Sequence, residues 1–209
     1  MTVHVPCGTR LAITRMKVRA PRRIKLSIGD DFDVVLEAAR SGAPWAFERL
    51  YHDLAPAVYG YIRLQGSAEP EDLCSEVFMG VFAGLSSFDG SEQQFRSWVF
   101  TIAHRRLTDE RRRFSRRPTV PTSDADVLDR LGGDAEKEAL DALGSRHVHE
   151  LCSELTAEQR DVLFLRVVAD LSVEQVAGVV GRSNGAVKAL QRRALTALRE
   201  KIAREGVTL

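Results

Sequence analysis

The most constraining feature of the sequence is a pattern of small and apolar residues between Val173 and Leu190. Ala177 stands where a small side chain lets two helices cross closely, and Gly181 stands where a tight turn usually requires a positive φ. Val187 and Leu190 follow at a spacing that would pack a second helix back onto the first. Because a tight turn between two helices imposes each of these residue types, the pattern predicts a helix-turn-helix.

Hydroxyl residues mark the expected helix starts in this part of the chain. Thr156 and Ser172 are each followed three residues later by a glutamine, Gln159 and Gln175, which fits a capping box. Ser183 can cap the second helix of the motif through its side chain. We therefore expect helices to begin directly after these three hydroxyl residues.

The second helix of the motif, expected over about Asn184–Ala203, has a cationic outer side. A recognition helix in the DNA major groove places its N-terminal residues on base edges and nearby cations on phosphates. The candidate DNA-contacting residues are Arg182, Ser183, Asn184, Gly185, Lys188 and Arg192. Gln191 falls nearer the apolar side and ranks below them. A helical hairpin with a solvated, charged face is the plain structural alternative.

The preceding part of the chain also predicts helices. Apolar residues recur at helical spacing in three stretches, Asp30–Gly42, Pro44–Gln65 and Pro70–Leu85. Pro56 should kink the second stretch, since proline removes a helical hydrogen bond. Ser86–Gln94 is polar and is expected to form a loop.

A further helix is expected over Phe95–Phe114, with an apolar side and a strongly cationic side. Arg106 falls within the apolar side. We expect its side chain to extend to solvent or to pair with Asp109 or Glu110.

Charge is arranged in blocks, although the net charge of the chain is only +1. Three segments are basic: Met1–Gly29, Thr101–Arg117 and Gly181–Arg204. Pro121–Ser145, which separates the last two, is acidic. This order indicates two phosphate contacts joined by a segment that avoids phosphate. Solvated helix faces are the alternative explanation for either basic block alone.

These patterns predict an all-α protein of two small helical domains joined by a flexible acidic linker. The expected divisions are a basic, disordered tail at 1–29, a first domain at 30–115, a linker at 116–147 and a second domain at 148–209. No apolar run approaches the roughly 20 residues that cross a bilayer, so stable membrane insertion is not expected. Cys7, Cys74 and Cys152 are odd in number and widely spaced, which fits the reducing cytoplasm.

Little in the sequence points to a metal or to catalysis. His147, His149 and Cys152 lie close together, but a fourth ligand and a familiar spacing are missing, so the question of metal binding stays open. No glycine-rich phosphate loop, paired carboxylates or Ser/Cys–His arrangement stands out. We therefore expect neither an enzyme nor a cofactor.

Both halves of the chain resemble one family, the bacterial RNA polymerase sigma factors of the sigma-70 family, specifically the extracytoplasmic-function (ECF) group. EDLCSEVF (Glu71–Phe78) resembles the polymerase-binding helix of region 2. FRSWVFTIAHRRLTDERRR (Phe95–Arg113) resembles the helix that reads the −10 promoter element. Leu155–Arg199 is similar to region 4, which reads the −35 element. Ser75 and Arg105 depart from residues common in the family, which puts individual contacts in doubt.

The resemblance implies an initiation factor that binds core RNA polymerase, directs it to promoter DNA and assists promoter melting. The implied contacts with the clamp helices of the largest subunit are Asp72, Ser75, Glu76 and Met79. The implied −10 contacts are Phe88, Asp89, Thr101, His104, Arg105, Thr108, Arg111 and Arg112.

The resemblance also implies that Leu155–Val168 helps to bind the flap of the second-largest subunit and that an anti-sigma factor controls the protein. From the residues alone, a stand-alone dimeric helix-turn-helix regulator of transcription is the main alternative.

Overall fold

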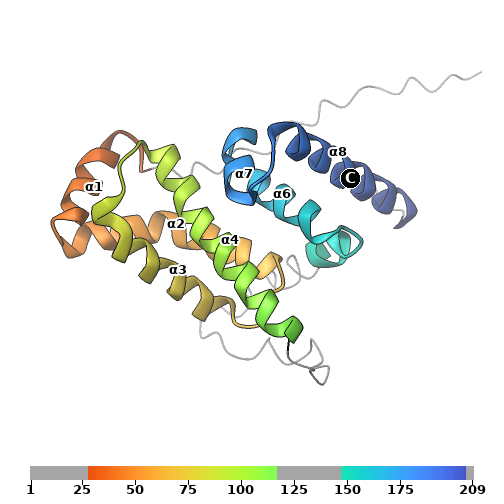
Figure 1. Cartoon of the computed structure of the whole chain (residues 1–209), viewed down its shortest axis with the longest axis horizontal. Coiled ribbons are helices and arrows are strands. Elements are labelled where there is room, and N and C mark those ends of the chain that lie inside the picture. The colour runs from red at the N-terminus through yellow and green to blue at the C-terminus, as the bar shows by residue number, and fades with distance from the viewer. Residues whose placement is uncertain (1–27, 117–146, 206–209) are drawn as a thin grey trace, which may run out of the picture.

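Every regular element in residues 28–116 and 147–205, the part of the chain that the computed structural model describes, is a helix (Figure 1). Most of the expected basic tail and most of the expected acidic linker lie outside these residues. The end predicted for the disordered tail was wrong, because Ile28 is buried and Gly29 begins a 3₁₀ turn. The helices form two groups, which we name the N-terminal bundle (28–116) and the C-terminal bundle (147–205). The all-α prediction with two helical domains is confirmed.

The N-terminal bundle contains four α-helices and two short 3₁₀ turns. Its α-helices are α1 (Phe32–Arg40), α2 (Pro44–Leu64), α3 (Pro70–Gly84) and α4 (Glu92–Arg116), and its 3₁₀ turns are η1 (Gly29–Asp31) and η2 (Leu85–Ser87). The helix α2 continues through Pro56 without a break. Helices α2, α3 and α4 pack on one another around a core in which Tyr61, Phe95 and Phe100 are fully buried.

The helix α4 begins inside the stretch expected to be a loop. The backbone N–H of Ser91 donates to Oε1 of Gln94 at 2.8 Å, and the N–H of Gln94 donates to Oγ of Ser91 at 3.4 Å. This reciprocal pair is a capping box, and it satisfies backbone groups that the first helical turn leaves without partners. The polar residues that suggested a loop therefore start the helix.

The predicted partners of Arg106 were wrong. Its Nη1 lies 3.6 Å from Oε2 of Glu76 on α3. Asp109 instead lies near Arg112, and Glu110 accepts a hydrogen bond from Ser67. Because α3 and α4 pack side by side, a carboxylate on the adjacent helix replaces the sequence neighbours as partner.

The C-terminal bundle contains a helical segment at 147–152 followed by α6 (Ala157–Val167), α7 (Val173–Val180) and α8 (Asn184–Glu205). Both predicted capping boxes are confirmed, at Thr156 before α6 and at Ser172 before α7. Gly181 ends α7 with φ +65°, and the N–H of Ala186 donates to Oγ of Ser183 at 3.3 Å. The helix-turn-helix formed by α7 and α8 is therefore confirmed in detail.

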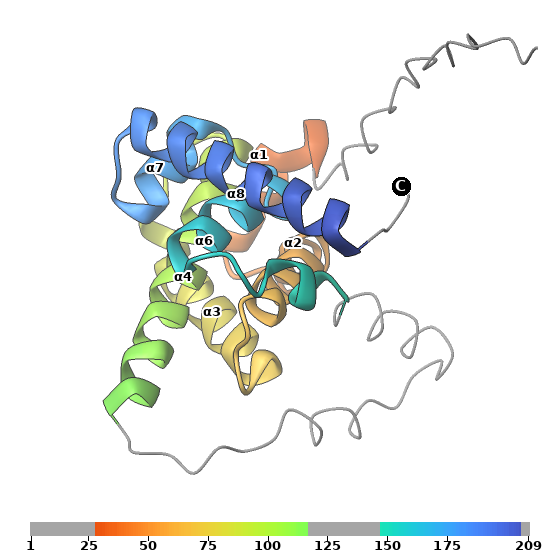
Figure 2. The same cartoon turned by 90° about the vertical axis from the view of Figure 1, so that its right-hand side faces the viewer.

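The two bundles pack against each other. The helix α7 lies along α4, and α6 contacts α2 (Figures 1 and 2). The helix α8 packs on α6 and α7 and extends away from the N-terminal bundle (Figure 1). As a result, α4 contacts helices of both bundles.

The turn of the helix-turn-helix gives the first testable prediction. Gly181→Ala should destabilise the protein by ~1 kcal/mol, because φ +65° is unfavourable for any residue with a Cβ. A Cβ at this position meets nothing within 4 Å, so the cost is conformational and not steric. The measurement is chemical denaturation of the full chain, followed by helical circular dichroism.

Gly178→Ala is the matched control for this prediction. Gly178 lies within α7, and a Cβ there also meets nothing within 4 Å. Alanine favours a helix interior over glycine by ~1 kcal/mol, so this variant should be stabilised. A Gly181→Ala protein as stable as Gly178→Ala would contradict the role of the left-handed turn.

Candidate nucleic-acid interface

The first candidate surface is the N-terminal part of α8. All five residues predicted there from Ser183 onward are exposed: Ser183, Asn184, Gly185, Lys188 and Arg192. Gly185, Lys188 and Arg192 share one side of the helix by their spacing, and Val187 is fully buried on the opposite side. The helix thus presents a small, open N-terminus followed by two cations, which suits insertion into a major groove.

Two further polar residues, one in the turn before α8 and one on α8, are less available. Arg182 is exposed but forms an ion pair with Glu158 on α6. Gln191 is half-buried, as its position near the apolar side predicted. The side chains open to a ligand on this surface are therefore those of Ser183, Asn184, Lys188 and Arg192.

The second candidate surface is the polar side of α4. Arg105 and Arg112 are exposed, whereas Thr101, Thr108 and Arg111 are half-buried. The hydroxyls of both threonines donate to backbone carbonyls one turn earlier in their own helix, each at 2.8 Å. The predicted residues therefore differ widely in how freely they can reach a ligand.

His104 belongs to the core more than to the cationic surface. Its Nδ1 lies 3.1 Å from Oη of Tyr61, which is fully buried. Burial lowers the pKa of His104, and the adjacent guanidinium of Arg111 lowers it further, against the opposing effect of Asp161. The imidazole is therefore neutral at pH 7 and unsuited to holding a phosphate by charge.

Arg111 is held by two residues that the sequence analysis missed. Its Nη1 lies 3.2 Å from Oδ1 of Asp161 on α6, and its Nη2 donates to Oε1 of Gln65 at 2.8 Å. Nε2 of Gln65 in turn donates to the same Asp161 oxygen at 2.7 Å. We name these three residues the junction triad. Because Gln65 is the C-cap of α2, whereas Arg111 lies on α4 and Asp161 on α6, no local sequence signal could have joined them.

The loop between α3 and α4 carries the remaining −10 candidates. The ring of Phe88 stacks on Trp98 and meets Phe95 edge-on, with 5.1 Å between ring centroids in both pairs. Its carbonyl oxygen also accepts a hydrogen bond from Arg40. The Asp89 side chain is fully exposed. Phe88 therefore anchors the loop, and Asp89 is the candidate that can reach a ligand.

A third surface lies on the outer side of α3. Asp72, Ser75 and Met79 are exposed there, whereas Glu76 is half-buried and pairs with Arg106. Met79 is 64% exposed and is one of six large apolar residues that are exposed in the described part of the chain. A methionine side chain is flexible and polarizable, so at a solvent-facing position it can contribute an adaptable contact to a protein partner.

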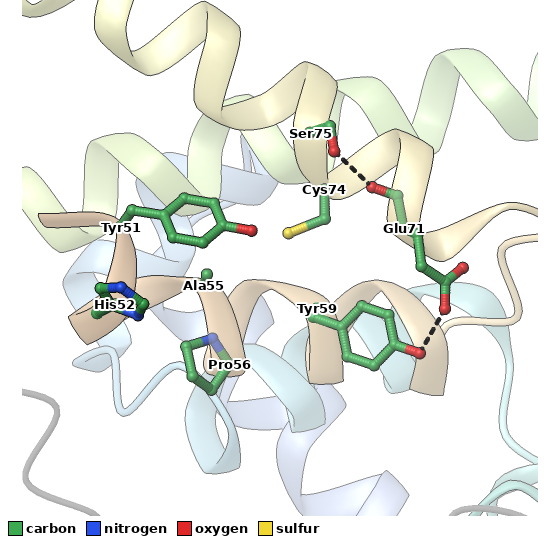
Figure 3. A pocket seen from close by; sticks show the side chains of 8 residues that line it. All are labelled: Tyr51, His52, Ala55, Pro56, Tyr59, Glu71, Cys74 and Ser75. Carbon is green, nitrogen blue, oxygen red and sulfur yellow. Dashed lines mark hydrogen bonds between the residues drawn. The ribbon is translucent and has the colours of Figure 1, made fainter. Parts of the chain in front are cut away.

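A groove between α2 and α3 adjoins this surface (Figure 3). Its lining residues are Tyr51, His52, Ala55, Pro56, Tyr59, Glu71, Cys74 and Ser75. The hydroxyl of Tyr59 donates to Oε1 of Glu71 at 2.8 Å. Burial, assisted by Glu71, raises the pKa of Cys74 to about 11, so its thiol is neutral at pH 7. The groove therefore offers aromatic contact area and not a reactive thiolate.

The segment containing His147, His149 and Cys152 forms no metal-binding group. Across residues 28–116 and 147–205, no three His, Cys, Asp or Glu side chains are grouped so that they could hold a metal ion. Cys152 is buried, which raises the pKa of its thiol. Within the same residues, no helix is both long enough and apolar enough to cross a membrane.

Comparison with known proteins shows the family of both bundles. Residues 50–117 match Sigma-70 region 2, and residues 153–200 match Sigma-70, region 4. The two matches follow in this order and together include α3, α4 and the helix-turn-helix.

Individual relatives cover most of the chain. It is 31% identical to the ECF RNA polymerase sigma factor SigD of Mycobacterium tuberculosis, over 85% of this chain and 87% of SigD. It is also 31% identical to the ECF RNA polymerase sigma factor BldN of Streptomyces coelicolor, over 78% of this chain and 63% of BldN. The chain thus spans slightly less than two thirds of BldN.

Solved structures show the same fold. CnrH, in complex with the cytosolic domain of CnrY, aligns with a TM-score of 0.61 and 22% identity, over 82% of this chain and 96% of CnrH. The sigma factor RpoE of Bartonella quintana, in complex with the anti-sigma factor NepR, aligns with a TM-score of 0.54 over 74% of this chain and 94% of RpoE. From the two region matches and the similarity to SigD, the chain belongs to the ECF RNA polymerase sigma factors of the sigma-70 family.

Proposed function

We propose that this chain binds core RNA polymerase and directs it to promoters by reading the −10 and −35 elements and assisting promoter melting. The observation that carries the proposal is the joint presence of sigma-70 regions 2 and 4, each with an exposed surface of suitable chemistry. The outer side of α3 offers a protein-binding surface, and the N-terminal part of α8 offers a DNA-binding one.

We assign polymerase binding to Asp72, Ser75 and Met79 on α3, facing the clamp helices of the largest subunit. Their exposure and the adjoining aromatic groove support this assignment. Glu76 contributes less directly, since it pairs with Arg106. For the flap of the second-largest subunit, we assign Val167, which is the large apolar residue that Leu155–Val168 exposes, at 67% and at the end of α6.

We assign −35 reading to Ser183, Asn184, Gly185, Lys188 and Arg192, with Arg182 in a secondary role because of its ion pair. We assign −10 contacts first to Arg105, Arg112 and Asp89, which are exposed. Thr101 and Thr108 line the same side of α4. Bases that leave a duplex need both stacking surfaces and cations to hold the backbone, and this side supplies the cations.

A stand-alone dimeric regulator is the weaker hypothesis, because it gives no role to a region 2 match. An anti-sigma partner is also proposed, since RpoE is seen bound to the anti-sigma factor NepR.

Run-off transcription with purified core polymerase tests the main proposal. A promoter-specific transcript is expected, whereas tight dimeric DNA binding without any transcript would establish the regulator instead.

The α8 assignment predicts that Lys188→Ala and Arg192→Ala each weaken −35-dependent transcription. A contact with a base edge is worth ~1–3 kcal/mol, so a loss of roughly tenfold is expected for each variant. Arg193→Ala is the control, since Arg193 is also exposed but lies on a different side of α8 from Lys188. Equal promoter use by all three variants would mean that the reading side is misplaced.

The α3 assignment predicts that Met79→Glu lowers affinity for core polymerase by roughly tenfold to a hundredfold, since a buried apolar contact of this size is worth ~1.5–3 kcal/mol. Val34→Glu on α1 is the matched control, because Val34 is 65% exposed and Met79 is 64% exposed. Binding is measured by titrating labelled protein with core polymerase. If Met79→Glu binds like Val34→Glu, the docking surface lies elsewhere.

A further inference from the structure

Arg40, at the end of α1, reaches the loop between α3 and α4 that carries two of the −10 candidates. Its Nη2 donates to the carbonyl oxygen of Phe88 and lies 3.9 Å from Oδ1 of Asp89. Its Nη1 lies 3.3 Å from Oε2 of Glu37, three residues earlier in α1. The chain between α3 and α4 passes beside α1 (Figure 1). One guanidinium thus joins α1 to two consecutive residues of this loop.

Two kinds of contact hold Phe88. Its ring stacks on Trp98, with 27° between the ring planes, and meets Phe95 edge-on. These ring contacts do not involve the carbonyl group, so they leave the peptide that follows Phe88 free to rotate. The hydrogen bond from Arg40 is made to that carbonyl oxygen. Because a peptide unit is planar, this bond fixes the orientation of the whole peptide that joins Phe88 to Asp89.

The chain after Asp89 is closely packed as well. A Cβ on Gly90 would lie 2.8 Å from Oε1 of Gln94 and 3.2 Å from Cζ of Phe88. Gln94 is itself held by Ser91 in the capping box that starts α4. Asp89 therefore projects a fully exposed carboxylate from a backbone that is held on both sides. A side chain presented in this way is preorganised for a ligand, because little backbone freedom is lost on binding.

The surroundings of Arg40 suit it to act on the loop and not on DNA directly. Its side chain is 27% exposed, whereas Arg105 and Arg112 on α4 are exposed residues. Its guanidinium already faces one carbonyl oxygen and two carboxylates. A hydrogen bond from a charged donor is roughly twice as strong as one between neutral groups. Arg40 is thus well placed to fix the loop, while the exposed arginines of α4 are free to meet phosphates.

We propose that Arg40 is a positioning residue for −10 recognition: it fixes the peptide between Phe88 and Asp89, so that the loop meets the unpaired promoter strand in one conformation. The inference rests on the proposed function for the contact of this loop with DNA. Arg40 lies 48 residues from Phe88 and at the end of a different helix, so no local sequence pattern joins the two.

The first readout uses the free protein, without polymerase or DNA. In a Trp45→Phe background, Trp98 is the only tryptophan of the chain, and its ring is stacked on Phe88. Without the bond from Arg40, the ring of Phe88 is less firmly held against the indole. Arg40→Ala should therefore increase the quenching of Trp98 fluorescence by acrylamide. Alanine favours helices, so α1 should remain folded, which circular dichroism checks.

Glu37→Gln is the matched control for this readout. It changes the other partner of Arg40 in α1 and leaves the donor to the Phe88 carbonyl in place. Its quenching should equal that of the Trp45→Phe background. Arg40→Lys keeps the charge and one donor group, so its quenching should lie between that of the background and that of Arg40→Ala. If Arg40→Ala quenches no more than Glu37→Gln, the positioning role is overturned.

The second readout is the affinity of the assembled holoenzyme for a single strand. The probe is a fluorescein-labelled oligonucleotide with the non-template −10 sequence of a promoter that the wild-type protein transcribes. Arg40→Ala should weaken binding by about twofold to tenfold, as for the loss of one hydrogen bond. Affinity for core polymerase, measured by the same titration as for Met79→Glu, should be unchanged.

Salt dependence separates positioning from direct contact. Each phosphate contact with a single strand contributes about 0.7 to the slope of log K against log salt concentration. Arg105→Ala should lower this slope by about that amount, whereas Arg40→Ala should leave it at the wild-type value. A slope lowered equally in both variants would overturn the proposal, since Arg40 would then bind phosphate itself. The quenching readout does not depend on transcription, so a failure of the proposed function can be told from a failure of this inference.

Discussion

Burial of one side of α4 fixes the directions of the candidate surfaces around it. Phe95, Phe100 and Leu107 are almost completely enclosed, and the ring of Phe100 meets that of Tyr61 edge-on with 5.7 Å between centroids. Such packing resists rotation of the helix, because each ring fills a shaped space that another orientation would leave empty. The polar side of α4 therefore has a defined direction, and the contacts of α4 with the C-terminal bundle are made around that fixed orientation.

The features that could be predicted from the sequence are those whose partners lie within a few residues. The capping boxes at Thr156 and Ser172 and the left-handed turn at Gly181 are local, so they fixed the bounds of α6 and α7 before any tertiary contact was known. The same rule applied to Ser91 and Gln94 would have placed the start of α4 correctly. The spacing of Ser91 and Gln94 thus indicated a helix start, but the polar composition of the surrounding residues favoured the prediction of a loop.

The sequence could not predict which polar side chains of α4 are exposed. Helical spacing gives the direction of each side chain around the helix axis, but it does not tell how much of the helix circumference is buried by neighbouring helices. A surface helix that packs on one neighbour buries a single stripe. The helix α4 contacts α2, α3 and α7, so its buried arc is wider and reaches His104. Arg106 likewise faces Glu76 on α3 and not its sequence neighbours. The number of packed neighbours decides this, and it is a property of the whole fold.

The junction triad shows the same limit. Asp161 lies 96 residues from Gln65 and 50 from Arg111, so only the packing of two bundles brings them together. Helical spacing places Arg111 on the cationic side of α4, yet its guanidinium is engaged by Asp161 and Gln65 and its side chain is only 31% exposed. The contacts of a cation, and not its position on a helix alone, therefore decide how freely it can reach a ligand.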